Sequence, residues 1–344
     1  MTVFLVIIVL ALLAVTGWQI SKIFHLSNTP DADTSQVANN QDNQNQGKLM
    51  LGFAAFIYLL MIYCFWEYSG VLLPEAASEH GSKYDNLMLI SILLIMFVQI
   101  VTQALLHYFA YKYRGAKGKK ALFYADNDKL EFIWTIIPVI TLAGLIIYGL
   151  FTWTDIMSIN EDEDPIVIEL YAQQFSWTAR YAGEDNTLGK ANVRFIEGTN
   201  VLGVKEEDSY AQDDKIVREL HLPVNKPVLF KLRSQDVLHS AYFPHFRAQM
   251  NVVPGMITQF GFTPTVTTAE MRNEDDIVDK VSHINELRKE NGDDEYQFDY
   301  FLLCNKICGQ AHYNMQMKVI VESQEDYEKW LAEQQTFGES LAQN

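Results

Sequence analysis

Two cysteines, two histidines and one methionine form the pattern in this sequence that is best suited to chemistry. Four of them share one short segment, and His239 lies upstream in the string Asp236-Val-Leu-His-Ser. The segment reads Cys304-Asn-Lys-Ile-Cys308-Gly-Gln-Ala-His312-Tyr-Asn-Met315. Thiolate, imidazole and thioether groups are the ligands that soft and borderline transition metals select. One loop can therefore present four ligands to a single point, with His239 completing the set.

A disulfide between Cys304 and Cys308 is one alternative. It would close so short a loop that little chain entropy is removed, and it would leave the neighbouring His and Met unexplained. The third cysteine, Cys64, stands inside an apolar stretch and is interpreted as a packing or lipid-facing residue. A metal site accounts for more of the pattern.

Several metal sites compete for these residues. Structural zinc would take two Cys and two His and leave Met315 unused. A mononuclear blue-copper site would take one Cys, two His and an axial Met, and would leave one thiol unused. A c-type haem needs Cys-x-x-Cys-His, whereas this chain has Cys-x-x-x-Cys-Gly. A pair of coppers sharing both sulfurs, with a nearby backbone carbonyl as the last contact, uses every ligand and suits one-electron transfer.

The elements that must position these ligands begin with a membrane region, predicted over residues 1–154. Four stretches without charged side chains approach or exceed the ~20 residues needed to span a bilayer. They are Val3 to Ile20, Met50 to Trp66, Leu87 to Tyr111 and Phe132 to Trp153. The first could be a secretory signal, but it has no preceding Lys or Arg and no clear cleavage site, so a retained span is favoured. The second is short and could be re-entrant or tilted.

The loops between these stretches predict the orientation of the chain. Lys and Arg gather between the third and fourth spans, over residues 112–129, which places that loop inside the cell. The loop between the second and third spans is acidic and is predicted to lie outside. Residues 28–47, rich in Asn, Gln and Asp, are expected to form a flexible inside linker. Everything after Trp153 is then external. The charge rule fits a bacterial or a mitochondrial membrane, and the four spans and the long insertion favour the periplasmic side of a bacterial inner membrane.

The external half, residues 155–334, predicts an all-β domain, and residues 335–344 a C-terminal tail. Short runs rich in Val, Ile, Phe and Tyr alternate with turn residues, a pattern typical of a sandwich or barrel. The runs are 166–171, 175–181, 228–232, 257–262, 298–304 and 317–321. Ser323 opens a capping box for a terminal helix. A charged insertion, residues 264–296, contains apolar residues at helical spacing.

The formal net charge of −17 argues against nucleic-acid binding, because a phosphate backbone requires a basic face. An acidic external domain would instead attract a basic protein partner.

On these motifs the chain resembles subunit II of the cytochrome c oxidases, which are haem–copper oxidases of respiratory membranes. The likeness extends from about Leu87 to the terminal helix. It rests on the string Glu131-x-x-Trp-Thr-x-x-Pro138, on the Asp-Val-Leu-His-Ser string and on the Cys-x₃-Cys-x₃-His-x₂-Met cluster. The resemblance implies a transmembrane α-helical region and an external cupredoxin-like barrel that carries a dinuclear copper centre, CuA.

The resemblance also implies roles for individual residues. Cys304 and Cys308 would bridge two coppers. The remaining contacts would come from His239, His312, Met315 and the backbone carbonyl of Lys306. Asp236 would help to set the electron path or dielectric beneath the centre. Glu131 would lie near the mouth of a proton pathway that belongs to subunit I.

Two positions depart from the pattern of that family. Lys306 replaces the usual Glu that helps to hold magnesium, and because an ammonium group repels a cation, no magnesium ion is predicted there. The usual Gln-Trp-x-Trp string reads Gln174-Phe175-Ser176-Trp177, so Phe175 stands at the usual electron-receiving position, with Trp177 behind it. The insertion and the extra N-terminal spans suggest a supercomplex in which the donor haem is fixed alongside.

The resulting expectation is a proton-pumping oxidase subunit. It would accept single electrons from a c-type cytochrome and pass them to haem in subunit I, where oxygen is reduced to water; this chain would bind no haem itself. Two alternatives remain open: subunit II of a quinol oxidase, a branch without the copper ligands, and a membrane-tethered copper-binding or copper-delivery module.

Overall fold

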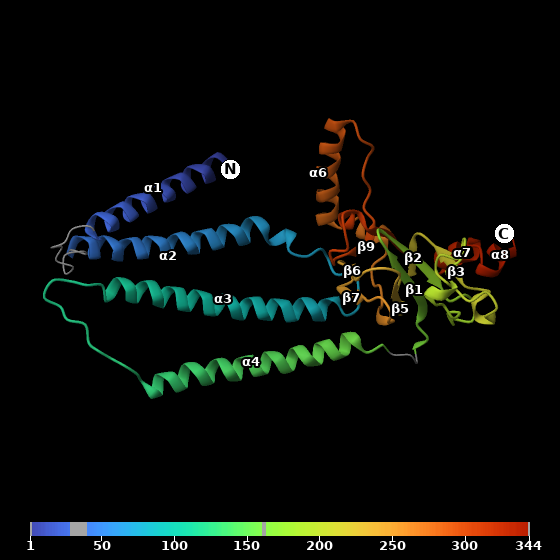
Figure 1. Cartoon of the computed structure of the whole chain (residues 1–344), viewed down its shortest axis with the longest axis horizontal. Coiled ribbons are helices and arrows are strands. Elements are labelled where there is room, and N and C mark those ends of the chain that lie inside the picture. Colours follow the sequence, from blue (N-terminus) through green and yellow to red (C-terminus); the bar gives the residue numbers. More distant parts are fainter. Residues whose placement is uncertain (1, 28–39, 160–162, 343–344) are drawn as a thin grey trace. The chain divides into compact units, whose positions relative to one another are not determined.

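The computed structural model describes residues 2–27, 40–159 and 163–342. The chain divides into two compact units, Met1–Ser69 with Leu94–Glu131 and Gly70–Leu93 with Phe132–Asn344. The long helices are α1 (Thr2–Ser27), α2 (Asn40–Tyr68), α3 (Gly81–Lys112) and α4 (Asp128–Met157) (Figure 1). Within the described residues, α2, α3 and α4 are long and apolar enough to cross a membrane, whereas α1 has only the shorter apolar stretch Val6–Ser21. Three predicted spans are confirmed as helices of that kind, and the count of four stays a prediction.

The first turns of α2 correct one expectation. Residues 40–47 are helical, although the Asn- and Gln-rich composition of residues 28–47 predicted a flexible linker. The Gln44 side-chain oxygen accepts hydrogen bonds from Arg114 Nε at 2.9 Å and Nη2 at 2.6 Å. Gly47 lies beneath the same side chain, since a Cβ there would stand 2.6 Å from Arg114 Cδ. A distant cation orders this segment, which composition alone does not reveal; residues 28–39 lie outside the described residues.

The external part is an all-β domain of two five-stranded sheets. One has the order β3-β2-β1-β5-β8 and the other β4-β10-β9-β6-β7. The strands are β1 (Ile166–Gln173), β2 (Ser176–Tyr181), β3 (Lys215–Val217), β4 (Leu220–Pro223), β5 (Val228–Ser234), β6 (His239–Phe243), β7 (Ala248–Val252), β8 (Thr258–Phe262), β9 (Tyr300–Cys304) and β10 (Gln316–Glu322). All six predicted runs are strands. The sequence pattern missed β3, β4, β6 and β7, which are short.

The core between the sheets is rich in aromatic side chains. Phe230, Phe243, Phe246, Phe260 and Phe262 are all buried, and their ring centroids lie 4.7–6.3 Å apart. Such aromatic pairs add to the free energy gained from burying apolar area. The core therefore provides a rigid support for the loops at the ends of the strands.

Strand pairing brings distant parts of the sequence to one end of the domain. β1 and β5 run parallel, with Ala172 opposite Ser234, so the segments after both strands leave the sheet together. In the other sheet, Ala241 near the start of β6 lies opposite Cys304 at the end of β9. The segments around residues 174, 236, 239 and 304 therefore meet at the same end of the sandwich.

The helices of the external part include two of the predicted ones. α6 (Asp275–Asn291) lies in the charged insertion after α5 (Thr268–Met271), and it ends at Gly292, which has a left-handed φ of 77°. α7 (Gln324–Glu333) begins at Ser323, whose side chain accepts from Asp326 N as predicted. The last segment is more than a tail, because α8 (Phe337–Ala342) buries Phe337 and its backbone N–H donates to Asp214 O.

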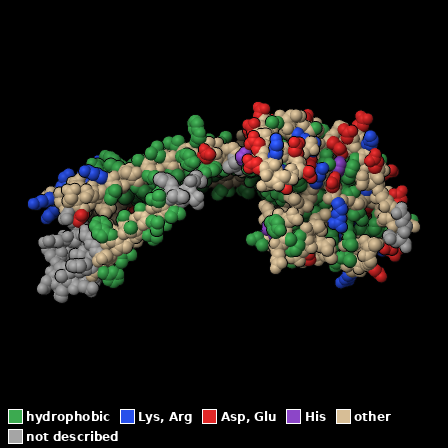
Figure 2. All heavy atoms as spheres, turned by 90° about the horizontal axis from the view of Figure 1, so that it is seen from above, with side chains coloured by type: hydrophobic (Ala, Val, Ile, Leu, Met, Phe, Trp, Pro, Cys, Tyr) green, Lys and Arg blue, Asp and Glu red, His purple; other side chains and the backbone are tan. Residues whose placement is uncertain are grey.

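Side-chain type separates the two kinds of surface. Exposed large apolar residues are concentrated on the four long helices, and acidic side chains gather over the β domain (Figure 2). This distribution is that of helices surrounded by lipid and an external domain surrounded by water.

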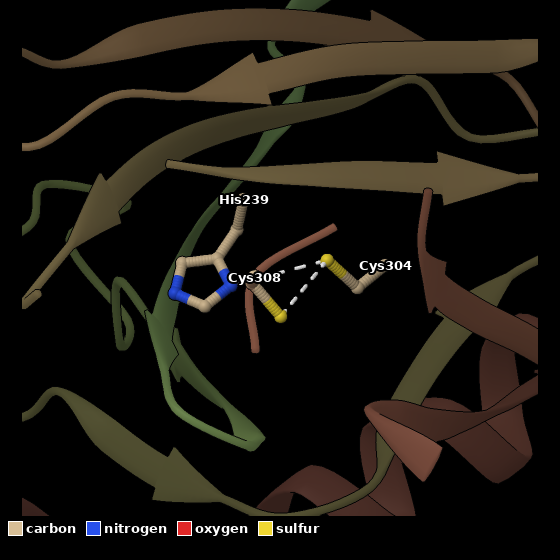
Figure 3. A group of neighbouring side chains, drawn as sticks. All are labelled: His239, Cys304 and Cys308. Atoms are coloured by element: carbon tan, nitrogen blue, oxygen red, sulfur yellow. Dashed lines mark hydrogen bonds between the residues drawn. The ribbon is translucent and has the colours of Figure 1, made fainter. Parts of the chain in front are cut away.

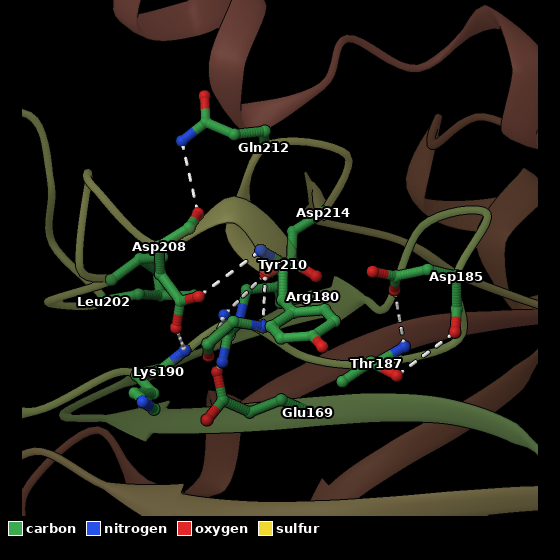
Figure 4. A network of polar contacts seen from close by, with 12 residues as sticks. Glu169, Arg180, Asp185, Thr187, Lys190, Leu202, Asp208, Tyr210, Gln212 and Asp214 are labelled. Atoms are coloured by element: carbon green, nitrogen blue, oxygen red, sulfur yellow. Dashed lines mark hydrogen bonds and ion pairs between the residues drawn. The ribbon is translucent and has the colours of Figure 1, made fainter.

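One face of the β3-β2-β1-β5-β8 sheet carries buried charges beneath the loop between β2 and β3. Arg180 donates to Glu169 at 2.8 Å and to Asp214 at 2.7 Å (Figure 4). Arg233 donates to the second oxygen of Glu169 and to Leu202 O. Two cations and two carboxylates thus fasten the loop to the sheet.

Candidate metal centre

His239, Cys304 and Cys308 come together at the end of the sandwich (Figure 3). Their ligand atoms all lie within 4.8 Å of one another. His239 is the first residue of β6 and Cys304 is the last residue of β9, so adjacent strands place them side by side. The loop after Cys304 turns back and brings the Cys308 sulfur to 3.8 Å from the Cys304 sulfur.

The remaining predicted ligands divide between the two sulfurs. The Cys308 sulfur lies 3.6 Å from His312 Nδ1 and 3.8 Å from the Met315 sulfur. The Cys304 sulfur lies 3.9 Å from His239 Nδ1 and 3.2 Å from the Lys306 carbonyl oxygen. The other four predicted metal ligands therefore surround the sulfur pair, and each sulfur has one imidazole beside it.

These separations fit bound metal ions. At about 2.3 Å from metal to sulfur and about 2.0 Å from metal to imidazole nitrogen, two ligands of one tetrahedral ion stand about 3.5–3.8 Å apart. The sulfur–sulfur and sulfur–nitrogen distances above are in or next to this range. The ligand atoms are two thiols, two imidazoles, a thioether and a carbonyl, which is a soft set that suits copper.

The centre is shielded from water. His239 is fully buried, Met315 is 1% exposed, Cys308 6% and Cys304 8%, while His312 is half-buried. Burial disfavours the thiolate of each Cys, but several hydrogen bonds, the largest of them with His239, together outweigh it and lower the pKa of Cys304 to about 6. Burial and the nearby charge of Cys304 raise the pKa of Cys308 to about 11. Metal binding would therefore displace a proton from Cys308 at neutral pH.

Asp236 fixes the orientation of His239. His239 Nε2 lies 2.8 Å from Asp236 Oδ1, which leaves Nδ1 turned toward the Cys304 sulfur. The other oxygen, Asp236 Oδ2, accepts from Gln174 N at 2.8 Å. Burial would raise the pKa of Asp236, but these hydrogen bonds lower it, so the carboxylate stays charged. A carboxylate on the far nitrogen of a ligating imidazole holds the ring and increases its basicity.

The two aromatic residues of the predicted electron relay occupy different depths. The Trp177 ring is 2% exposed and its centroid lies 6.2 Å from that of His239. Phe175 is half-buried, and its ring reaches the backbone of Gly309, directly after Cys308. Phe175 therefore lies on the outer side of the centre and Trp177 on the inner side.

Glu131 and the side chain of Lys306 lie apart from the sulfur pair. The Lys306 side chain is exposed and only its carbonyl faces the centre. Glu131 stands in the first turn of α4, exposed, on a membrane helix. The sequence reasoning missed Gln174, whose side chain donates to Cys308 O; its place next to Phe175 was the available signal.

Two family models match this chain. One is described as the transmembrane domain of cytochrome c oxidase subunit II and covers residues 66–151. The other is described as the periplasmic domain of the same subunit and covers residues 166–269. The chain belongs to the cytochrome c oxidase subunit II family. It is therefore a membrane protein with an external cupredoxin-like domain. Members of this family are components of an oxidoreductase.

Similar proteins include both cytochrome c and quinol oxidases. The alternative cytochrome c oxidase subunit 2 of Bradyrhizobium diazoefficiens is 34% identical over 67% of this chain and 72% of its own length. The cytochrome c oxidase subunit 2 of Thermostichus vulcanus is 25% identical over 77% of this chain and 79% of its own. The quinol oxidase subunit 2 of Bacillus subtilis is 26% identical over 56% of this chain and 54% of its own.

Solved structures give weaker likenesses. A heme-copper terminal oxidase dimer has a chain that is 15% identical, with a TM-score of 0.32, over 57% of this chain and 99% of that one. The periplasmic domain of subunit II from Bradyrhizobium japonicum is 18% identical, with a TM-score of 0.29, over 48% of this chain and 91% of that one.

Proposed function

We propose that this chain is the electron-input subunit of a proton-pumping cytochrome c oxidase. It takes single electrons from a c-type cytochrome at a dinuclear CuA centre and delivers them to haem in subunit I. The observation that carries the proposal is the complete ligand set around two sulfurs 3.8 Å apart. The ligands are Cys304, Cys308, His239, His312, Met315 and the Lys306 carbonyl.

The chemistry that the centre supplies when loaded is the reversible gain of one electron shared by two coppers. The residues of this chain provide the cage that would hold the metal. β6 and β9 fix His239 and Cys304, and Asp236 holds the imidazole. A cage that moves little between redox states keeps the cost of reorganisation low, as preorganised sites do in general.

The surface around the ligand loops suits contacts with other proteins. Ile307 and Tyr313, which lie within these loops, are each 87% exposed. Exposed apolar side chains of this size next to a functional centre are typical of interaction sites. We assign them to contacts with the other oxidase subunits or with the cytochrome, and Phe175 to the path by which the electron enters. Glu131 would stand near the proton pathway of subunit I.

Magnesium is not part of this proposal. The Lys306 ammonium group cannot ligate a cation and would repel it, whereas its carbonyl remains available to copper. Metal analysis of the purified complex would then show copper, and the magnesium content would be the same in the unsubstituted chain and in the Lys306→Ala variant. Magnesium lost on Lys306→Ala substitution would contradict this assignment.

The test of the proposed function is copper loading of the full-length chain in detergent, followed by metal analysis and EPR. Two coppers per chain with one unpaired electron shared between them is the expected result. Zinc in preference to copper, or one copper with a localised signal, would remove the dinuclear centre and leave only the family membership.

A quinol oxidase subunit II is the second candidate, because relatives with that name match this chain. Such a chain would bind no copper under the same conditions, and the complex would oxidise quinol rather than cytochrome c. A membrane-tethered copper-delivery module is the third. It would bind copper yet purify without a haem-bearing subunit, so co-purification of haem separates it from the first two.

A further inference from the structure

The turn between β1 and β2 lies directly on the cysteine loop. Gln174 and Phe175 form this turn, and they are far from Cys308 in sequence. The Gln174 side-chain Nε2 donates a hydrogen bond of 2.5 Å to the Cys308 carbonyl oxygen. Its backbone N–H donates to Asp236 Oδ2 at 2.8 Å. One exposed glutamine is thus bonded to both segments that supply the buried ligands.

The fit of this turn against the loop is close. Gly309 follows Cys308 with a φ of 143°, in the region that favours glycine. A Cβ at Gly309 would stand 2.8 Å from Phe175 Cζ and 2.9 Å from Gln174 Nε2. Because Gly309 has no side chain, the turn can approach the backbone of the loop closely. The Gln174 amide is therefore in position to control the peptide group that follows Cys308.

That peptide group connects two predicted ligands. Cys308 lies on one side of it, and the backbone continues through Gly309 to His312, whose N–H donates to Gly309 O at 3.3 Å. Among the described residues, the backbone of this loop makes one further bond to the rest of the domain, from Asn305 N–H to Ser240 O, while Cys304 N–H donates to Met315 O within the ligand segment. Gln174 Nε2 thus supplies a side-chain bond from outside the loop at the point where the Cys308 sulfur must be aimed.

We propose that Gln174 is a positioning residue for the metal centre, and that its side-chain amide fixes the orientation of Cys308 and of the segment leading to His312. Gln174 itself contacts no predicted metal position; it acts through the Cys308 carbonyl. The inference about copper rests on the proposed function, whereas the ordering of the loop does not.

The variant Gln174→Met tests this directly. Met has a similar length and offers no N–H donor, and the backbone bond to Asp236 is kept. Gln173→Met is the matched control, because Gln173 is the last residue of β1, directly before the turn, is exposed, and has no side-chain hydrogen bond among the described residues. Gln174→Lys restores a donor at this place.

The first measurement is hydrogen exchange of the full-length, metal-free chain in detergent. We expect the amides of residues 308–312 to exchange about tenfold faster in Gln174→Met than in Gln173→Met, since each lost kilocalorie of local stability raises exchange about fivefold. Gln174→Lys should recover part of the protection. Equal exchange in the two Met variants would overturn the proposal.

The second measurement is made on the copper-loaded chain. Gln174→Met should still bind two coppers but release them to a chelator about tenfold faster, in keeping with the usual effect of outer contacts on metal sites. Its EPR hyperfine splitting and midpoint potential should also shift, whereas those of Gln173→Met should not. A change confined to KM for the cytochrome, with unaltered spectrum and exchange, would contradict a positioning role.

The two proposals can fail separately. If the unsubstituted chain binds no copper pair, the proposed function is wrong, and the exchange measurement still decides the role of Gln174. If the unsubstituted chain shows the CuA signal and Gln174→Met matches it in every readout, the proposed function stands and the positioning role is wrong.

Discussion

The β domain contains two buried polar clusters that differ in what they leave available. In the first, the sulfurs of Cys304 and Cys308 make long contacts, 3.8 Å to each other and 3.9 Å from Cys304 to His239 Nδ1. In the second, Arg180 is bonded to the carboxyl groups of Glu169 and Asp214 at 2.8 and 2.7 Å. Both are buried and both join distant segments of the chain.

The difference shows how a binding site can be told from a structural network. Buried charges are stable only when they are paired and hydrogen-bonded, and the paired carboxylates and guanidinium groups are then unavailable to a ligand. The sulfur cluster instead consists of weak hydrogen-bonding groups held together by the strands around them. The contacts among these groups contribute little to the stability of the fold, whereas binding of a metal ion would contribute much.

The largest expected effect breaks the first cluster. Cys308→Ser should abolish the shared-electron copper signal completely, because one bridging sulfur is lost, while the β domain remains folded. Metal analysis and EPR of the full-length chain check this. The control is Cys64→Ser, an exposed cysteine on α2 that should leave the copper content at two. A normal signal in Cys308→Ser would exclude it as a ligand.

Breaking the second cluster should affect stability and leave copper binding intact. Arg180→Met leaves Glu169 and Asp214 buried without their shared partner, and removing one member of a buried ion pair costs about 3–5 kcal/mol. Thermal unfolding of the β domain, followed by near-UV circular dichroism, should show a clear fall in Tm. The exposed Arg218→Met is the control. A large loss of copper from the folded Arg180→Met chain would show that the clusters are coupled.

A smaller effect is expected from Asp236→Asn, which keeps the shape of the side chain but removes the charge facing His239 Nε2. Loss of such a contact typically lowers metal affinity by about 10–100-fold. Competition with a copper chelator measures it, and Asp276→Asn on α6, in the exposed first turn, is the control. Unchanged affinity would mean that the strands alone orient His239.

The last prediction concerns the pH dependence of stability. Burial raises the pKa of Asp214 from 3.8 to about 7, although Arg180 and the Gly189 N–H favour its charged form. The folded state therefore binds a proton more tightly than the unfolded state, so this group makes the protein less stable as pH rises from about 4 to about 7. The other charged groups near it are Glu169, which is bonded to Arg180, Arg233, which is bonded to Glu169, and Asp213 beside it in the chain.

Asp214→Asn removes this titration and should flatten the dependence of Tm on pH over that interval, with the copper signal unchanged. The measurement is a set of thermal melts in buffers that cover the interval. Parallel curves for the two proteins would show that Asp214 keeps the same proton in both states.

The sequence predicted the ligands of the first cluster and none of the second. Cys, His and Met at close spacing predict a metal site by residue type alone, whereas Glu169, Arg180 and Asp214 look like ordinary surface charges until β1 and β2 are paired. β6 was missed because it begins with two polar residues, His239 and Ser240, although both are buried in the structure. The helical residues 40–47 were missed because the cation that orders them, Arg114, is far away in sequence.

The sequence by itself determined the kinds of atom available for chemistry and the lengths of the apolar segments, since both depend on residue types read along a short stretch. Only the tertiary structure decided that His239 accompanies Cys304 while His312 and Met315 accompany Cys308. It also decided that Gln174 is bonded to the Cys308 carbonyl and that Asp236 is bonded to His239. These contacts follow from the parallel pairing of β1 with β5 and from the β6–β9 ladder, which join residues with no relation in sequence.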